Sequence, residues 1–244
     1  MERIDLVSEF NLEEMEAINM FRVEERYALE DRMLAAVMEG NTEEALKALA
    51  EFSSFPMPRY KGAEISVEKR KIPLISMNTL LRKSVQMASV HPAHIDHVSA
   101  KFAKIILEAE TKEELDSLSK EMVRKYCLLV RSYSLKGYTD LTQDALNYID
   151  FNLTEELSLA KVAEKLNVNK KYLSQKFKTE TGQTITEYIN SKRVQESLKY
   201  LSTTNLSISD VALRVGMYDM NYYSRVFKKV MDMTPSEYRN MIQS

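Results

Sequence analysis

Two stripes of polar side chains recur at helical spacing in the C-terminal part of the chain, and their types are those that contact nucleic acid. Arg pairs with guanine, Asn and Gln pair with adenine, and Lys and Ser reach either base edges or phosphate oxygens. At the spacing i, i+3, i+4, i+7, such side chains share one face of a helix. The first stripe is Lys171, Ser174, Gln175 and Lys178, and the second is Asn221, Ser224, Arg225 and Lys228.

Each stripe taken alone would also suit the solvated face of an ordinary amphipathic helix. Two observations favour nucleic acid instead. The stripes follow matching short helices and turns, and residues 169–193 hold six Lys and Arg residues against two Glu residues. We therefore predict that both stripes bind double-stranded promoter DNA.

An internal repeat places the two stripes in equivalent settings. Ser158 corresponds to Ser207 at an offset of 49 residues, and after one added residue Tyr172 corresponds to Tyr222 at an offset of 50. Each copy comprises a short helix, a tight turn and a second helix with an apolar inner face, which is the layout of a helix-turn-helix. We predict these motifs at 158–181 and 207–230, with DNA-reading second helices at 170–181 and 219–230.

A helix predicted over 185–202 joins the two motifs. At about 1.5 Å per residue it spans roughly 27 Å, whereas consecutive major grooves on one side of DNA lie about 34 Å apart. A rigid connection of this length would place both second helices in successive grooves, with the DNA bent if the helices sit closer than one turn. On this helix, Lys192 and Arg193 are predicted to hold phosphates.

Two segments carry a family resemblance: LSLAKVAEKLNVNKKYLSQKFKTETG, at 157–182, and ISDVALRVGMYDMNYYSRVFKKVMDMTPSEYR, at 208–239. Through them, residues 142–242 resemble the AraC/XylS family of transcription regulators. The resemblance implies a seven-helix DNA-binding domain with two helix-turn-helix motifs on one long helix. It also implies base-reading positions at Lys170, Lys171, Ser174, Gln175, Met220, Asn221, Tyr222 and Arg225.

The chain departs from the family pattern at two positions. Gln175 stands where many relatives have Arg, so the first motif is expected to add affinity and to favour adenine. Met217 replaces the usual aromatic residue after Gly216, which we expect to alter packing only. With Arg225 beside Asn221, the second motif is therefore the stronger base reader.

The rest of the chain is predicted to be helical as well. It contains only five Gly and five Pro residues, which is few for a sheet protein. Helix starts are marked by Asn41 and by capping boxes that begin at Thr111, Thr184 and Thr234. The predicted helices cover 12–39, 42–52, 64–89, 92–109, 112–135, 142–152, 159–166, 170–181, 185–202, 208–215, 219–230 and 235–242, with a loop at 53–62.

A break at 136–138 divides the chain. We expect an all-α protein with a helical domain over 1–138, which senses a signal or forms a dimer, and the DNA-binding domain over 139–244. The first part resembles helical regions of some Firmicutes regulators of this family, through 78–83, 90–92 and 122–127. A homodimer, a small-molecule effector and RNA polymerase are candidate partners, and activation and repression are both open. A sensor should enclose an apolar pocket, whereas a platform for other proteins should expose an apolar patch.

Other classes of protein are disfavoured. No apolar run is long enough to cross a membrane, and the first residues lack the pattern of a signal peptide. The single cysteine, Cys127, lies in an apolar stretch and fits a buried thiol of a cytoplasmic protein. No catalytic triad, carboxylate pair or phosphate-binding loop stands out, so we expect no enzymatic activity.

The three histidines, His91, His94 and His97, invite interpretation as a metal site. On a helix, His97 would lie roughly 240° around the axis from His91, at about 100° per residue, so three ligands would not converge. Pro92 directly after His91 indicates an ordinary helix start. We therefore expect no metal and no cofactor.

Overall fold

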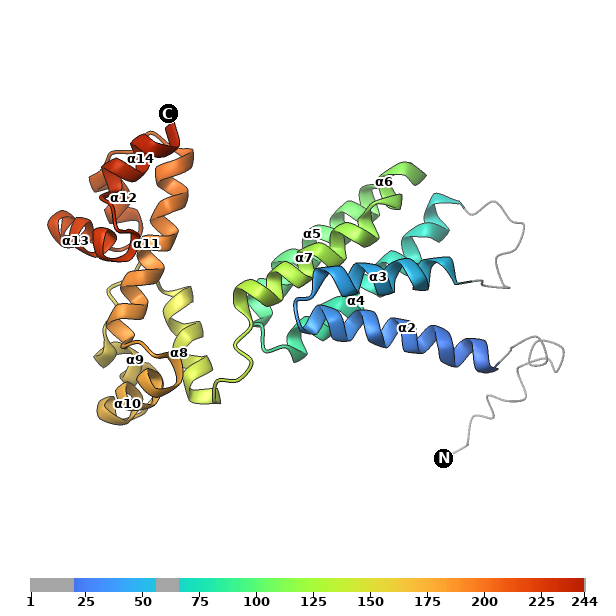
Figure 1. Ribbon diagram of the computed structural model, residues 1–244, viewed down its shortest axis with the longest axis horizontal. Coiled ribbons are helices and arrows are strands. Elements are labelled where there is room, and N and C mark those ends of the chain that lie inside the picture. Colours follow the sequence, from blue (N-terminus) through green and yellow to red (C-terminus); the bar gives the residue numbers. More distant parts are fainter. Residues whose placement is uncertain (1–19, 56–65, 244) are drawn as a thin grey trace. The chain divides into compact units, whose positions relative to one another are not determined.

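The computed structural model describes residues 20–55 and 66–243, and the chain divides into two compact units, Met1–Lys136 and Gly137–Ser244. Every regular element in the described residues is a helix (Figure 1), which confirms the predicted all-α fold class. In the same ranges, no helix is long and apolar enough to span a membrane. The start of the helix predicted at 12–39 and most of the loop predicted at 53–62 lie outside the described residues.

The N-terminal unit is a helical bundle organised around its last helix, α7. Its described elements are α2 (Met20–Met38), α3 (Thr42–Ser54), α4 (Val67–Met87), α5 (Pro92–Glu108), α6 (Lys112–Asp116) and α7 (Leu118–Tyr133). Helix α7 packs against α2, α3, α4 and α5. Because α7 supplies Met122, Val123 and Tyr126 to the core with no exposed surface, it is the central helix of this bundle.

The prediction of a single helix over 112–135 is wrong, because α6 ends at Asp116 and α7 begins at Leu118. The capping box of Thr111 and Glu114 starts α6 as predicted. Asp116 then forms an ion pair of 2.9 Å with Arg70 of α4. Both Leu115 and Leu118 are buried, so the short interruption still keeps the apolar residues on each side of it in the core.

A buried polar network crosses this core. The Tyr126 hydroxyl donates to Asn78 Oδ1 at 2.6 Å, and Asn78 Nδ2 donates to the Ser99 carbonyl oxygen at 3.0 Å. The ring of Phe102 stacks on Tyr126 with centroids 6.2 Å apart. The network joins α4, α5 and α7, and it satisfies polar groups that would destabilise the core if they were left unpaired.

The C-terminal unit is built on the long helix α11. Its elements are α8 (Asp140–Phe151), α9 (Leu159–Lys165), α10 (Lys170–Thr181), α11 (Ile185–Thr203), α12 (Ile208–Arg214), α13 (Met220–Met231) and α14 (Pro235–Gln243). Helix α11 contacts α10 of the first repeat copy, α12 and α13 of the second copy, and the last helix, α14. A helix of this length spans about 28 Å at about 1.5 Å per residue.

Equivalent side chains cap the repeated helices. Asn169 accepts hydrogen bonds from two backbone N–H groups at the start of α10, and Asp219 does the same at the start of α13. Asp219 therefore precedes the second reading helix, which begins one residue later than predicted. The capping boxes predicted at Thr184 and Thr234 both form, with Glu187 and Glu237 as the reciprocal partners.

The two copies also pack their cores in the same way. Phe177 meets the ring of Tyr188 edge to face at 5.7 Å, and fifty residues later Phe227 meets Tyr238 at 6.0 Å. Such pairs fix each second helix against the helix that follows it. The other equivalent core residues, all buried, are Val162 and Val211, Ala163 and Ala212, and Leu173 and Tyr223.

Candidate nucleic-acid interface

The first stripe lies on the solvent side of α10. Leu173 and Phe177 are fully buried, which fixes the orientation of the helix. Ser174 is half-buried. The exposed members of the predicted set are Lys170, Lys171, Gln175 and Lys178.

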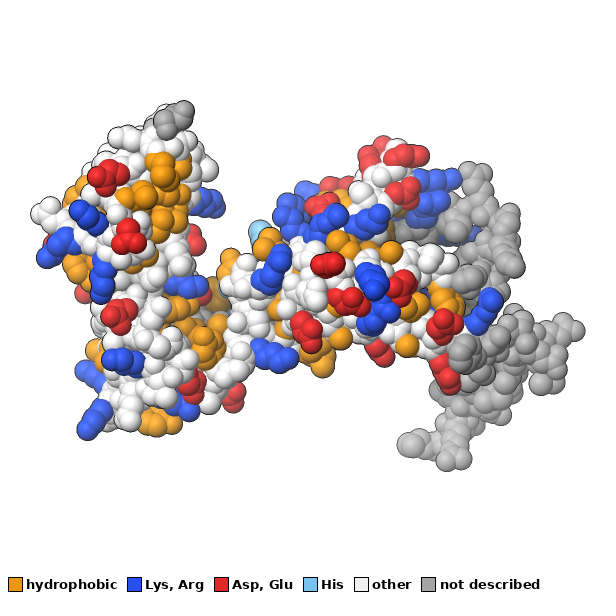
Figure 2. Space-filling view, in the orientation of Figure 1, with side chains coloured by type: hydrophobic (Ala, Val, Ile, Leu, Met, Phe, Trp, Pro, Cys, Tyr) orange, Lys and Arg blue, Asp and Glu red, His pale blue; other side chains and the backbone are white. Residues whose placement is uncertain are grey.

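The second stripe lies on α13 in the same relation to its core. Tyr223 and Phe227 are buried, and Ser224 is half-buried. The exposed members are Met220, Asn221, Tyr222, Arg225 and Lys228. Figure 2 shows Lys and Arg side chains over both α10 and α13, so each reading helix carries positive charge on its exposed side.

A contact from α11 orients part of the second stripe. Asn190 Nδ2 donates a hydrogen bond of 2.7 Å to the Tyr222 hydroxyl, and the guanidinium carbon of Arg225 lies 5.9 Å from the centre of the Tyr222 ring. Asn190 was missed by the sequence reasoning, which selected only the charged residues Lys192 and Arg193 from this helix. Its contact leaves the hydroxyl proton of Tyr222 available for donation to a partner.

A phosphate contact from Arg193 would have to replace hydrogen bonds that its guanidinium makes inside the fold, and it stays a prediction. Arg193 is buried, with only 8% of its surface exposed. Its Nε donates a hydrogen bond of 3.0 Å to the Leu153 carbonyl oxygen, and its Nη2 donates one of 2.6 Å to the Glu155 carbonyl oxygen. The guanidinium is thus taken up by the loop between α8 and α9. The residues around Arg193 in the sequence do not indicate this contact, because the loop lies 40 residues earlier in the chain.

The neighbouring Lys192 is half-buried and pairs with Asp150 of α8, with 3.1 Å between Nζ and Oδ2. The Tyr188 hydroxyl donates to the other oxygen of the same carboxylate at 3.1 Å. A phosphate contact from Lys192 would have to compete with this pair, and it stays a prediction.

Two exposed tyrosines belong to the same region and were not predicted. Tyr172 on α10 is 57% exposed and is the repeat counterpart of Tyr222, so the offset of 50 residues would have identified it. Tyr218 is exposed in the turn before α13. Tyrosine combines an apolar ring with a hydroxyl that can donate to phosphate.

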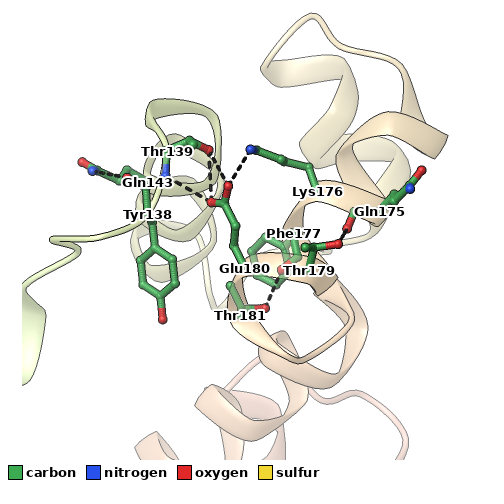
Figure 3. Close-up of polar contacts among 9 residues, drawn as sticks. All are labelled: Tyr138, Thr139, Gln143, Gln175, Lys176, Phe177, Thr179, Glu180 and Thr181. Atoms are coloured by element: carbon green, nitrogen blue, oxygen red, sulfur yellow. Dashed lines mark hydrogen bonds and ion pairs between the residues drawn. The ribbon is translucent and has the colours of Figure 1, made fainter.

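A carboxylate on the opposite side of α10 anchors that helix to the start of α8 (Figure 3). Glu180 accepts hydrogen bonds from the Thr139 backbone N–H at 3.1 Å and from the Thr139 hydroxyl at 3.0 Å, and its Oε1 lies 2.7 Å from Lys176 Nζ. Donation by Lys176 above all, followed by Thr142 and then Thr139, lowers the pKa of Glu180 to about 2. Lys176 therefore serves the packing of α10.

Two histidines and the cysteine, weighed above for other chemistry, have local structural settings in the fold. His91 caps α5, with Nδ1 accepting from the Ala93 N–H at 3.2 Å, and His94 stacks on Tyr133 at 4.0 Å. Over the described parts of the chain, no three His, Cys, Asp or Glu side chains are grouped so as to hold a metal ion. Cys127 is buried, and burial raises the pKa of its thiol.

Comparison with known proteins places this geometry in a family. A family described as a helix-turn-helix domain matches residues 162–241. Over 106 residues, the chain is 35% identical to the regulatory protein SoxS of Escherichia coli strain K12, an overlap of 43% of this chain and 99% of SoxS. The chain belongs to the AraC/XylS family of transcription regulators. The predicted family and the predicted function, a DNA-binding transcription regulator, are thus confirmed.

Two further matches cover similar shares of the chain. The bifunctional transcriptional activator/DNA repair enzyme AdaA of Bacillus subtilis is 38% identical over 94 residues, which are 38% of this chain and 44% of AdaA. Among solved structures, the C-terminal domain of AraT, a response regulator from Geobacillus stearothermophilus, is 33% identical with a TM-score of 0.42, over 43% of this chain and 88% of that one. The relatives are mostly transcription regulators.

Proposed function

We propose that this AraC/XylS-family regulator binds promoter DNA by placing α10 and α13 in two successive major grooves. The observation that carries the proposal is the structural equivalence of the two reading helices, each capped alike, packed alike and exposed on its polar stripe. Helix α11 spans about 28 Å and successive grooves lie about 34 Å apart, so the bound DNA must bend if α10 and α13 sit closer together than one turn of DNA.

The side chains of the two stripes have distinct roles in this proposal. Arg225 pairs with guanine, Asn221 and Gln175 with adenine, and Met220 contacts a thymine methyl group. The lysines hold phosphates and give affinity without sequence preference. The second motif thus supplies most of the discrimination among sequences.

Paired substitutions separate these roles. Arg225→Ala is expected to weaken binding to the preferred site by about 1–3 kcal/mol and to relax the preference at one base pair. Lys178→Ala is expected to weaken binding to all sequences and to reduce the salt slope by about one unit. Both effects are measured by gel-shift titrations of each variant on the preferred site and on random DNA at several salt concentrations. An equal loss from Arg225→Ala on every sequence would identify a phosphate contact and refute the assigned role.

The N-terminal unit is proposed to make a protein contact, and a second copy of the chain is the favoured partner. The observation behind this proposal is that its helix α4 exposes the apolar side chains of Ile72 and Met87, each more than 60% accessible. RNA polymerase and a small-molecule effector are the other candidate partners. We further propose that the protein acts in the cytoplasm, without a cofactor and without enzymatic activity. Selection of bound DNA from a random pool tests the dimer. One chain accounts for two subsites in successive grooves, so a dimer is expected to select two copies of this two-subsite sequence, and a single copy would contradict it.

A further inference from the structure

We infer that the loop segment Leu153–Glu155, between α8 and α9, locks the second helix-turn-helix to the first and thereby sets the spacing between the two DNA subsites. The inference rests on the proposed two-groove function. Nothing in the sequence of this loop suggests such a role. The evidence is that two separate elements, the joining helix α11 and the turn of the second helix-turn-helix, meet this one segment.

The first element is α11, through Arg193. Its two hydrogen bonds, at 3.0 and 2.6 Å, end on the carbonyl oxygens of Leu153 and Glu155. A buried guanidinium that donates to two backbone carbonyls holds both groups in a fixed geometry, since losing either bond leaves a polar group unpaired. The middle of α11 is therefore attached to the loop that leads into the first helix-turn-helix.

The second element is the turn of the second helix-turn-helix, at Gly216. A Cβ atom at this position would lie 2.9 Å from the carbonyl oxygens of both Leu153 and Thr154. The turn backbone thus touches the loop directly, and only a residue without a side chain fits there. Gly216 also has a φ of 81°, which favours glycine independently.

Two attachments restrict motion more than one does. If α11 were the only connection, the second motif could tilt or turn as the helix flexed. With the turn at Gly216 also resting on the loop, α13 cannot rotate about the axis of α11 without breaking the contact. One extra base pair would rotate the second subsite by about 34° and move it by about 3.4 Å along the DNA axis. We therefore expect a single permitted spacing.

The test compares two glycines that differ in one respect. Gly182 and Gly216 both have positive φ, at 74° and 81°, so alanine is strained at either. A Cβ atom at Gly182 meets nothing within 4 Å, whereas one at Gly216 meets the loop. Gly182→Ala is thus the matched control for Gly216→Ala. Each full-length variant is titrated with the selected site and with versions that have one base pair added or removed between the subsites.

The expected result is a loss of spacing preference in one variant only. The natural chain and Gly182→Ala should prefer the natural spacing by about tenfold, since a displaced base-pair contact costs about 1–3 kcal/mol. Gly216→Ala should bind the natural spacing about tenfold less well while binding the altered spacings almost unchanged. Arg193→Met, which keeps an apolar stem but cannot donate to the carbonyls, should behave like Gly216→Ala and decides the matter if the glycine variant does not fold.

The possible outcomes distinguish a failure of this inference from a failure of the two-groove proposal on which it rests. If the site selected by the natural chain contains a single subsite, the two-groove proposal itself fails. If the site contains two subsites but the natural chain shows no spacing preference, the two-groove proposal stands and the inference of a fixed spacing is wrong. If the natural chain has the preference and the folded variants at Gly216 and Arg193 keep it in full, the loop does not set the spacing and the inference is wrong. An equal weakening by Gly182→Ala and Gly216→Ala at every spacing also overturns it, because the effect would then come from backbone strain.

Discussion

The contact between Asn190 and Tyr222 gives a sharp prediction about DNA recognition. Asn190→Ala removes the amide that donates to the Tyr222 hydroxyl at 2.7 Å. The hydroxyl then loses its orientation, and so does the ring over which Arg225 lies. We expect weaker binding to the preferred site and little change on random DNA, because the lysines that hold phosphates are untouched.

The size of the effect follows from the geometry. A neutral hydrogen bond contributes about 0.5–1.5 kcal/mol net. Tyr222 is 38% exposed, so water can replace the lost amide in the variant. The lower half of the range therefore applies, and a loss of about 0.5–1 kcal/mol corresponds to roughly a two- to fivefold weaker affinity.

A double-mutant cycle measures this coupling. Asn190→Ala and Tyr222→Phe are made singly and together, and affinity for the selected site is measured by titration. We expect their losses to be less than additive by about 0.5–1 kcal/mol, because each removes the same hydrogen bond. Tyr172→Phe on α10 supplies the control, since Tyr172 is the repeat counterpart and its loss should add to that of Asn190→Ala. Additive losses in both pairs would refute the proposed link between α11 and the reading face.

Two further predictions concern stability. The folded pKa of Glu180 is about 2, below its ordinary 4.5, so the carboxylate stabilises the fold above about pH 4.5 and that contribution disappears as the pH falls toward 2. Melting curves of Glu180→Gln and the natural chain should converge over that interval, and a constant difference would contradict the assignment. Tyr126→Phe leaves Asn78 Oδ1 without its buried donor and should destabilise the chain by about 1–3 kcal/mol in urea unfolding; no loss would mean that another donor replaces it.

Local chemistry made much of this protein predictable from its sequence. The pairs Thr184 with Glu187 and Thr234 with Glu237 mark helix starts because both partners of each capping box lie within one turn. The internal repeat could also be identified from the sequence, since matching apolar positions recur at a nearly constant offset. Helical periodicity then identified the exposed sides of α10 and α13, because each of these short helices buries a single face.

Tertiary structure alone decided the roles of the polar residues on α11. Arg193, Lys192 and Asn190 look alike in the sequence, as hydrophilic residues of a helix next to a DNA-reading motif. In the fold, Arg193 meets the loop after α8, Lys192 meets Asp150, and Asn190 meets Tyr222. The physical reason is that α11 is packed by elements on several sides, so periodicity cannot tell a solvated position from one facing another segment's carbonyl or carboxylate oxygens. The sequence by itself determined the two reading helices, and the tertiary structure decided how they are held together.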